Sequence, residues 1–247
     1  MFGRRKKAPA TYISTVIAAA GMSSRMNGID KQQAPIDEVP VVIRTLAAFE
    51  ACPRIDEVIL VCREEMIPEY YSLIQEHMLR KVISVVGGGP TRQDSVFLGI
   101  RACNPAATHY AIHDGARPLV EGSVIDSCID AALAYGAAAA GIPVRDTIKV
   151  RDEAGFVATT PPRAQLIAIQ TPQIFEAGLY RAAMAAAQRQ GRIYTDDCQL
   201  IEHAGKPVYI SPGSSENIKI TTPEDLAIAQ AVLKYREEGP DQWMLFE

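Results

Sequence analysis

The chain has 247 residues, of which 48% are hydrophobic and 22% charged, so it is long enough and apolar enough to bury a core. Its formal net charge of -4 argues against a surface built to neutralise nucleic-acid phosphates. No segment approaches the roughly 18 to 20 apolar residues of a membrane span. We therefore expect a cytoplasmic protein that binds neither nucleic acid nor a membrane, and whose ligands are small anions.

The five cysteines lie far apart in the sequence, without any C-x-x-C pair. Neither a zinc site nor a disulfide framework is indicated by this spacing. We expect reduced thiols at Cys52, Cys62, Cys103, Cys128 and Cys198.

The first twenty residues allow two interpretations. Arg4 to Lys7 is basic and Ala18 to Ala20 is small, as in a secretory signal peptide. However, the apolar stretch Val16 to Ala20 is short beside the roughly 7 to 15 residues of a signal's apolar region. We favour a mobile basic terminus over residues 1–10, then a single domain over 11–235 and a tail over 236–247.

Apolar runs of strand length alternate with helical patterns in the first half of the chain. The runs are nearly continuous, as in strands that are buried on both faces. Strands are predicted at 12–20, 57–62, 82–86 and 110–113, and helices at 41–52, 64–79 and 94–102. This alternation predicts an α/β fold with a parallel, doubly wound sheet.

The middle of the chain breaks this alternation. A helix is predicted from Ser123, as N-cap, to Tyr135, with Gly136 ending it, and a strand at 138–144. Strand-like segments at 147–151 and 156–160 then flank a turn, which predicts a β-hairpin. A hairpin inserted in such a domain projects from it, so we expect an arm at about 145–164 that mediates dimerisation.

The remaining elements return to the helix and strand patterns. We predict strands at 166–170 and 207–210, and helices at 176–190 and 198–204. A last helix begins with Thr222 as N-cap and Pro223 in its first turn.

A glycine-containing loop, Gly21 to Arg25, follows the first strand. In doubly wound folds ligands bind beyond the carboxyl ends of the strands, where glycine lets backbone N–H groups approach a phosphate. The loop matches neither the dinucleotide-binding nor the Walker pattern. Arg25 and Lys31 supply two cations that could stabilise charge on a polyphosphate.

Two further loops occupy equivalent positions. Gly87 to Ser95 follows the third strand, and its three consecutive glycines indicate close approach of a base or ribose. Asp114 ends the fourth strand, where a carboxylate can face Mg²⁺ held by substrate phosphates, and Arg117 can bind an anion. His113 is expected to be packed. Together the loops suit transfer between phosphates, because a phosphate monoester is already nucleophilic at neutral pH.

Eight short motifs have the order and spacing of the 2-C-methyl-D-erythritol 4-phosphate cytidylyltransferase family, which this chain resembles from about Ile13 to Val232. They are AAGMSSRM (19–26), DKQ (30–32), GGGPTRQDSV (87–96), HDGARP (113–118), PVRDTIK (143–149), QTPQIF (170–175), TDD (195–197) and NIKITTPEDL (217–226).

The resemblance implies a Rossmann-like nucleotidyltransferase fold and a homodimer with interlocking hairpin arms. It also implies transfer of CMP from CTP to methylerythritol phosphate with Mg²⁺, and release of pyrophosphate. By motif match, the catalytic residues would be Arg25, Lys31, Arg163 and Lys219, and the acceptor would be bound by Arg117, Thr147, Thr171 and Thr195. CTP would contact Ala19, Ala20, Gly21, Ser23, Gly88, Gly89, Ser95 and Asp114. Thr147 and Arg163 would come from the neighbouring subunit's arm.

Three positions depart from the family pattern, and the mildest is Gly115 in place of a usual alanine. Ser23 replaces a usual glycine, which could crowd the triphosphate or supply a hydroxyl to it. Asp30 stands where proline commonly precedes the lysine, so we expect a less rigid loop and a less preorganised Lys31.

Two alternatives remain open. A cytidylyltransferase for ribitol 5-phosphate or a similar polyol phosphate would share these loops, because acceptor choice depends on a pocket that one sequence does not display. A non-catalytic nucleotide-binding module is the alternative from another class. The presence of Arg25, Lys31, Asp114, Arg163 and Lys219 together argues against it.

Overall fold

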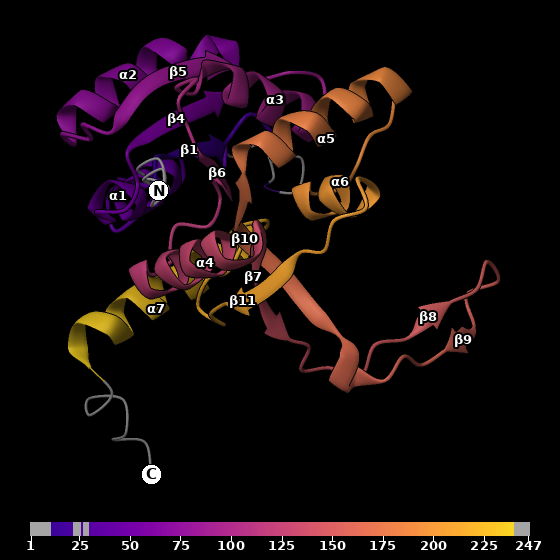
Figure 1. Ribbon diagram of the computed structural model, residues 1–247. Helices are drawn as coiled ribbons and strands as arrows, with labels where there is room; N and C mark the ends of the chain where they lie inside the picture. The colour runs from indigo at the N-terminus through magenta and orange to yellow at the C-terminus, as the bar shows by residue number, and fades with distance from the viewer. Residues whose placement is uncertain (1–10, 22–25, 27–29, 240–247) are drawn as a thin grey trace, which may run out of the picture.

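The protein is described here from a computed structural model, which covers residues 11–21, 26 and 30–239. A seven-stranded sheet has the order β11-β7-β10-β6-β1-β4-β5 (Figure 1). All neighbouring strands are parallel except β10, which runs antiparallel to β6 and β7. The predicted α/β fold with a mostly parallel sheet is confirmed. The strands are β1 (Ile13–Ala18), β4 (Glu57–Cys62), β5 (Val82–Gly87), β6 (His109–Asp114), β7 (Ala137–Pro143), β10 (Ile167–Glu176) and β11 (Tyr209–Pro212).

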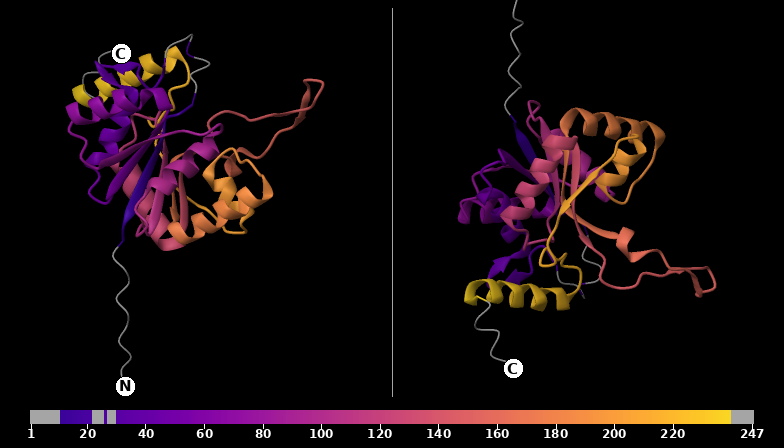
Figure 2. Two further views of the ribbon diagram at one scale, coloured as in Figure 1. Left: turned by 90° about the horizontal axis from the view of Figure 1, so that it is seen from above. Right: turned by 60° about the horizontal axis from the view of Figure 1, so that its bottom comes forward.

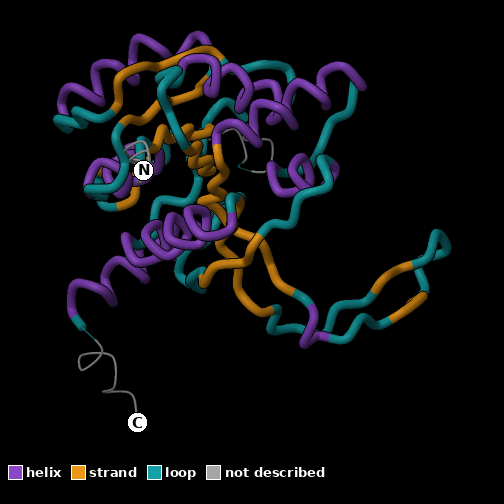
Figure 3. The backbone as a smooth tube through the Cα atoms, viewed as in Figure 1, coloured by secondary structure: helices purple, strands orange, loops and turns teal. Residues whose placement is uncertain are grey.

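Helices cover both faces of this sheet (Figures 2 and 3). In β1, Ile13 and Ile17 belong to one buried cluster and Val16 to another, because successive side chains of a strand point to opposite faces. The first cluster includes α1 (Val41–Ala51), α2 (Ile67–Glu76) and α4 (Gly122–Tyr135). The second includes α3 (Arg92–Ala102), α5 (Ala177–Gln190) and α6 (Asp197–His203).

A third, smaller cluster lies beneath the last helix. It joins α7 (Pro223–Glu238) to a short hairpin of β2 (Pro35–Ile36) and β3 (Val39–Pro40), which the sequence analysis did not predict. Two short 3₁₀ helices, η1 (Glu64–Met66) and η2 (Arg163–Gln165), complete the fold. No helix in the described part of the chain is both long and apolar enough to cross a membrane.

The strand order creates a switch point beside β1. The chain moves from β1 to β4 and β5, and then returns to the opposite side of β1 with β6. The carboxyl ends of β1 and β6 are in register, with Ala18 opposite Asp114. Open α/β sheets bind ligands at such points, because the loops that follow the two strands diverge there.

The predicted arm projects from the sheet (Figures 1 and 2). It carries β8 (Val150–Arg151) and β9 (Val157–Thr159), an antiparallel pair shorter than the predicted strands. Residues 145–160 are all exposed, including Phe156 at 72%. A two-stranded ribbon that does not pack against other elements is only marginally stable, so its paired segments stay short.

Other helix and strand boundaries show where the local sequence patterns predicted correctly and where they did not. α4 begins at Gly122 with Glu121 as its N-cap, so the assignment of Ser123 as N-cap was wrong. Gly136 ends α4 with a φ of 81°, as predicted. β10 continues to Glu176, well beyond the predicted 166–170, with a shift of register between Ile169 and Gln173. The five cysteines are buried and free.

Candidate active site

A cavity of about 430 Å³ opens at the carboxyl ends of β1, β5 and β6, and we call it the donor cavity. It lies at the switch point of the sheet, where the sequence placed an anion site. Its walls come from Ala18, Ala20, Gly21, Lys31, Gln32, Gly89, Pro90, Thr91, Arg92, Ser95, Asp114, Ala116 and Lys219.

The wall after β5 is a glycine loop held against the start of α3. The backbone N–H of Gly89 donates to Ser95 Oγ over 3.0 Å, and Ser95 Oγ donates to the Thr91 carbonyl over 2.9 Å. A Cβ on Gly88 would lie 2.3 Å from Ala20 Cβ, so this glycine allows the two loops to meet. The glycines of this loop therefore accommodate close contacts within the protein, and the approach of a base or ribose stays a prediction.

The start of the following helix is fixed by a capping box. The Thr91 side chain accepts from the Asp94 backbone N–H, and the Asp94 side chain accepts from the Thr91 N–H. This reciprocal pair satisfies N–H groups that have no partner within the helix. It holds Arg92, the first residue of α3, in place at the cavity wall.

Lys31 lines the donor cavity from the opposite loop. Asp30 Oδ1 accepts from the backbone N–H of Gln32 over 3.0 Å, and Asp30 Oδ2 pairs with Arg63, just after β4. The sequence analysis expected Asp30 to leave this turn less rigid than proline would. That lower rigidity stays a prediction, and the structure adds that the Asp30 carboxylate ties the turn to the residue that follows β4.

Asp114 is the electrostatic centre of the site. Its carboxylate is within 2.7 Å of Lys219 Nζ, 3.5 Å of Arg92 Nε and 3.7 Å of Arg117 Nε. Its backbone N–H donates to Thr171 Oγ1 over 3.1 Å. Burial alone would raise the pKa of Asp114, but the three cations outweigh burial and lower that pKa well below its usual range.

A second cavity of about 170 Å³ adjoins this cluster, and we call it the acceptor cavity. It is lined by Arg92, Asp114, Arg117, Ile169, Gln170, Thr171, Gln173, Thr195, Asp196 and Lys219. Arg92, Asp114 and Lys219 line both cavities and form a shared wall. A group in one cavity and a group in the other can both contact this wall.

His113 is not part of either wall. Its ring is fully buried, 4.8 Å from the ring of Phe49, and burial lowers the pKa of its imidazole to about 3. The prediction that His113 is packed is confirmed. In the described part of the site, the titratable side chains facing the cavities are Asp114, Asp196, Lys31, Lys219 and the arginines.

The structure brings together most of the predicted site residues that it describes. Ala20, Gly21, Lys31, Gly89, Ser95, Asp114 and Lys219 line the donor cavity, and Arg117, Thr171 and Thr195 line the acceptor cavity. Ala19 and Gly88 lie just behind the donor wall, since Ala19 is buried and Gly88 packs on Ala20. Arg25 and Ser23 lie outside the described residues.

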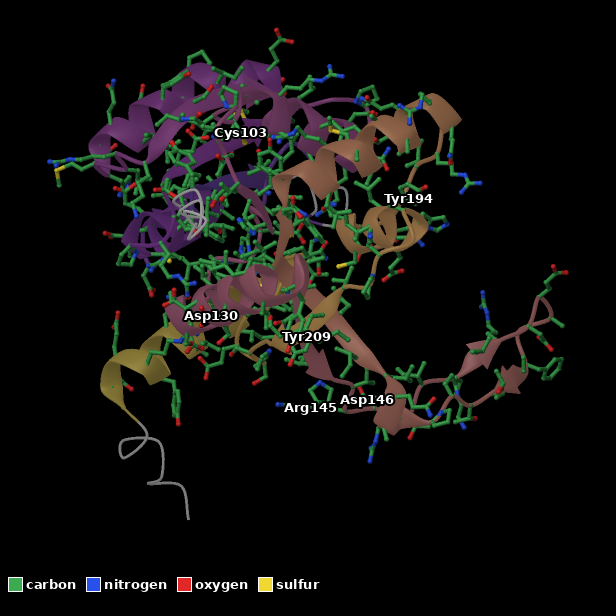
Figure 4. All side chains as sticks on the ribbon, viewed as in Figure 1. Cys103, Asp130, Arg145, Asp146, Tyr194 and Tyr209 are labelled. Atoms are coloured by element: carbon green, nitrogen blue, oxygen red, sulfur yellow. The ribbon has the colours of Figure 1, made fainter. Side chains whose placement is uncertain are left out.

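Two predicted site residues, one catalytic and one acceptor-binding, lie elsewhere in this chain. Thr147 and Arg163 are exposed on the segments that join the arm to the sheet, and neither is among the residues that line the two cavities. Arg163 Nη1 donates to the carbonyl of Arg145 over 3.0 Å, and Arg145 lies at the base of the arm, away from the helices of the core (Figure 4).

Several lining residues were given no role by the sequence analysis. Arg92, Gln170, Gln173 and Asp196 all fall within the motifs already noted. The motifs marked their segments, but only the fold shows which side chain of each segment faces a cavity.

Comparison with known sequences agrees with this geometry. The sequence profile of the 2-C-methyl-D-erythritol 4-phosphate cytidylyltransferases matches residues 13–235. The chain is 44% identical over 222 residues to a protein of that name from Dehalococcoides mccartyi, covering 90% of this chain and 96% of the relative. A second, from Desulforamulus reducens, is 43% identical over 230 residues, covering 91% and 97%.

Solved structures show the same similarity in three dimensions. The 4-diphosphocytidyl-2C-methyl-D-erythritol synthase from Anaerococcus prevotii superposes with a TM-score of 0.81 at 30% identity, covering 91% of this chain and 99% of that one. The 2-C-methyl-D-erythritol 4-phosphate cytidylyltransferase from Thermus thermophilus has a TM-score of 0.75 at 30% identity, covering 91% and 100%. The chain belongs to the 2-C-methyl-D-erythritol 4-phosphate cytidylyltransferase family.

Proposed function

We propose that this protein transfers CMP from CTP to 2-C-methyl-D-erythritol 4-phosphate. The products are 4-diphosphocytidyl-2-C-methyl-D-erythritol and pyrophosphate, in non-mevalonate isoprenoid precursor biosynthesis. The observation that carries the proposal is the wall of Arg92, Asp114 and Lys219 shared by two adjoining cavities. A donor triphosphate in the larger cavity and an acceptor phosphate in the smaller one would meet at this wall.

The chemistry needs positioning more than a general base. The acceptor's phosphate monoester has a second pKa of about 6, so it is mostly dianionic and nucleophilic at neutral pH. An acceptor phosphate oxygen attacks the α-phosphorus of CTP, and the bond to the bridging oxygen breaks as pyrophosphate leaves. Lys31 and Lys219 face that region and can stabilise the developing negative charge. Arg117 can bind the acceptor's phosphate from the other side.

The residues present fit a magnesium ion that arrives with the nucleotide. Asp114 offers one carboxylate at the shared wall, and no group of three potential metal ligands occurs among the described residues. Mg²⁺ commonly binds through one or two carboxylates and the substrate's phosphates. Asp114 would hold it, and the ion would neutralise phosphate charge.

We also propose that the active form is a homodimer through the arm. Thr147 and Arg163 would then complete the acceptor cavity of the neighbouring subunit. Three observations support this: neither residue is among those that line its own chain's two cavities, the arm extends away from the sheet, and it exposes apolar side chains such as Phe156 and Val157. Burial of those side chains against another copy would stabilise the pair.

The test is an acceptor comparison. Purified protein, CTP and Mg²⁺ are incubated with methylerythritol 4-phosphate in one reaction and ribitol 5-phosphate in another, and pyrophosphate release is followed. Release with the first alone is expected. Release with the second alone would make this a polyol-phosphate cytidylyltransferase, and silence in both would indicate a non-catalytic nucleotide-binding module.

A further inference from the structure

Arg92 is the member of the shared wall that the sequence analysis gave no role. It lines both cavities, as do Asp114 and Lys219. Resting on the proposed function, we propose that Arg92 is a positioning residue for the transfer. Anchored on Asp197, it fixes the Asp114 carboxylate between the donor and acceptor phosphates.

The guanidinium of Arg92 lies between two carboxylates, one that lines the cavities and one that does not. Its Nη1 donates to Asp197 Oδ2 over 2.8 Å, on the side away from the site. Its Nε faces Asp114 Oδ1 at 3.5 Å, on the cavity side. The planar fork of an arginine holds both contacts in a fixed geometry, whereas the ammonium of a lysine is a point charge on a flexible stem.

Asp197 is a rigid anchor. Its side chain is 4% exposed, and its Oδ1 accepts from the Tyr180 hydroxyl over 2.7 Å. The backbone N–H groups of Asp197 and Cys198 both donate to Gln173 Oε1 over 3.2 Å. Arg92 is therefore held from behind by the Asp197 carboxylate, and neither Asp197 nor Tyr180 is among the residues that line the two cavities.

The two oxygens of the Asp114 carboxylate contact different cations. Arg92 contacts Oδ1, whereas Lys219 and Arg117 contact Oδ2. Without Arg92, Asp114 Oδ1 loses its cationic contact. The carboxylate can then rotate toward Lys219 and Arg117, which displaces the Lys219 ammonium from its position at the wall. Small misplacements of this kind are costly in a reaction that depends on positioning.

A gain in folding stability does not by itself explain why Arg92 pairs with two carboxylates. A buried ion pair is often no more stabilising than an apolar pair of similar volume, because both charges lose their hydration. Arg54 is a comparison residue with a similarly exposed side chain, 34% against 30% for Arg92. It also bridges two carboxylates, Asp126 at 3.6 Å and Asp130 at 2.8 Å, but these are more exposed than the partners of Arg92.

The test compares Arg92→Gln and Arg92→Lys with Arg54→Gln in the full-length enzyme, measuring kcat, both KM values and Tm. Both Arg92 variants should lose at least about tenfold in kcat with KM for CTP changed less than about threefold, the signature of lost transition-state positioning. Arg54→Gln should keep normal kcat. Turnover by the unmutated protein reports separately on the proposed function.

Three results would overturn the inference. Arg92→Gln could lower Tm alone, as a merely structural residue would. It could raise KM with kcat unchanged, which would make Arg92 a substrate-binding group. Full activity of Arg92→Lys would show that charge suffices and that the fork positions nothing.

Asp197→Asn and Tyr180→Phe test the anchor. Each should lower kcat in the same pattern, and Arg92→Gln with Asp197→Asn should be no worse than Arg92→Gln alone, because Asp197 acts through Arg92. If the kcat losses of Arg92→Gln and Asp197→Asn instead multiply in the double variant, the anchoring role is wrong. Tyr180→Phe keeps the buried ring and removes only the hydroxyl, so it tests the anchor even if Arg92→Gln does not fold. Unchanged kcat in Tyr180→Phe would contradict the proposal.

Discussion

Lys219 Nζ lies 2.7 Å from Asp114 Oδ2, so the cation proposed to meet the acceptor phosphate is already oriented by a buried carboxylate. Lys219→Ala should therefore lower kcat by at least about 10²-fold, the scale of losing one transition-state donor. Pyrophosphate release under saturating substrates measures this. Lys234→Ala, which removes a surface lysine paired with Glu238 on α7, is the control and should retain normal kcat.

The Asp30–Arg63 pair ties the turn before Lys31 to the end of β4. Arg63→Gln should lower kcat by about tenfold, because Lys31 is then less well positioned. Glu65→Gln is a close control, since it removes only the more distant carboxylate, 3.6 Å from Arg63 Nε. Equal kcat values for the two variants would show that the Asp30 contact does not position Lys31.

The shared-site dimer predicts complementation between inactive variants. Lys219→Ala and Arg163→Ala should each be nearly inactive alone. Mixed and allowed to exchange, they should recover roughly a quarter of normal activity, because half of the dimers are hybrids with one intact site each. If hybrids are confirmed by native mass spectrometry and stay inactive, Arg163 serves its own chain's site.

His113 should make stability depend on pH. Its folded pKa of about 3 lies below the unfolded value near 6.5, so the unfolded state binds one more proton between these pH values. The contribution is complete above pH 6.5 and is lost as pH falls, by about 1.4 kcal/mol of unfolding free energy per pH unit. Urea unfolding from pH 7.5 to 4.5 measures it, and His113→Leu should show a correspondingly smaller slope below pH 6.5.

Gly99 allows α3 to pack closely on the sheet. A Cβ there would lie 2.5 Å from Val16 Cγ1 and 2.8 Å from Val61 Cγ2, both in the core. Gly99→Ala should lower the free energy of unfolding by about 1 to 3 kcal/mol through overpacking. Gly122→Ala, at the open start of α4, meets nothing within 4 Å and should not destabilise the protein.

Much of the fold follows from short-range patterns. The continuous apolar run at β4 and the glycine that ends α4 were readable because burial on both faces and a positive φ each demand particular residues. β10 was misjudged at Pro172 because its neighbours β6 and β7, which are distant in sequence, sustain the strand. The β2–β3 hairpin was missed because it is stabilised by α7, also far along the chain.

The sequence by itself determined the α/β alternation, the loops that carry the chemistry and the family, because these depend on local residue types and their order. Only the tertiary structure decided that Arg92, Asp114 and Lys219 share one wall, since strand order and register bring together side chains from α3, β6 and the loop before α7. It also decided that Asp197 anchors Arg92 and that Asp30 is tied to Arg63, because ion pairs between segments depend on distances in space and not along the chain.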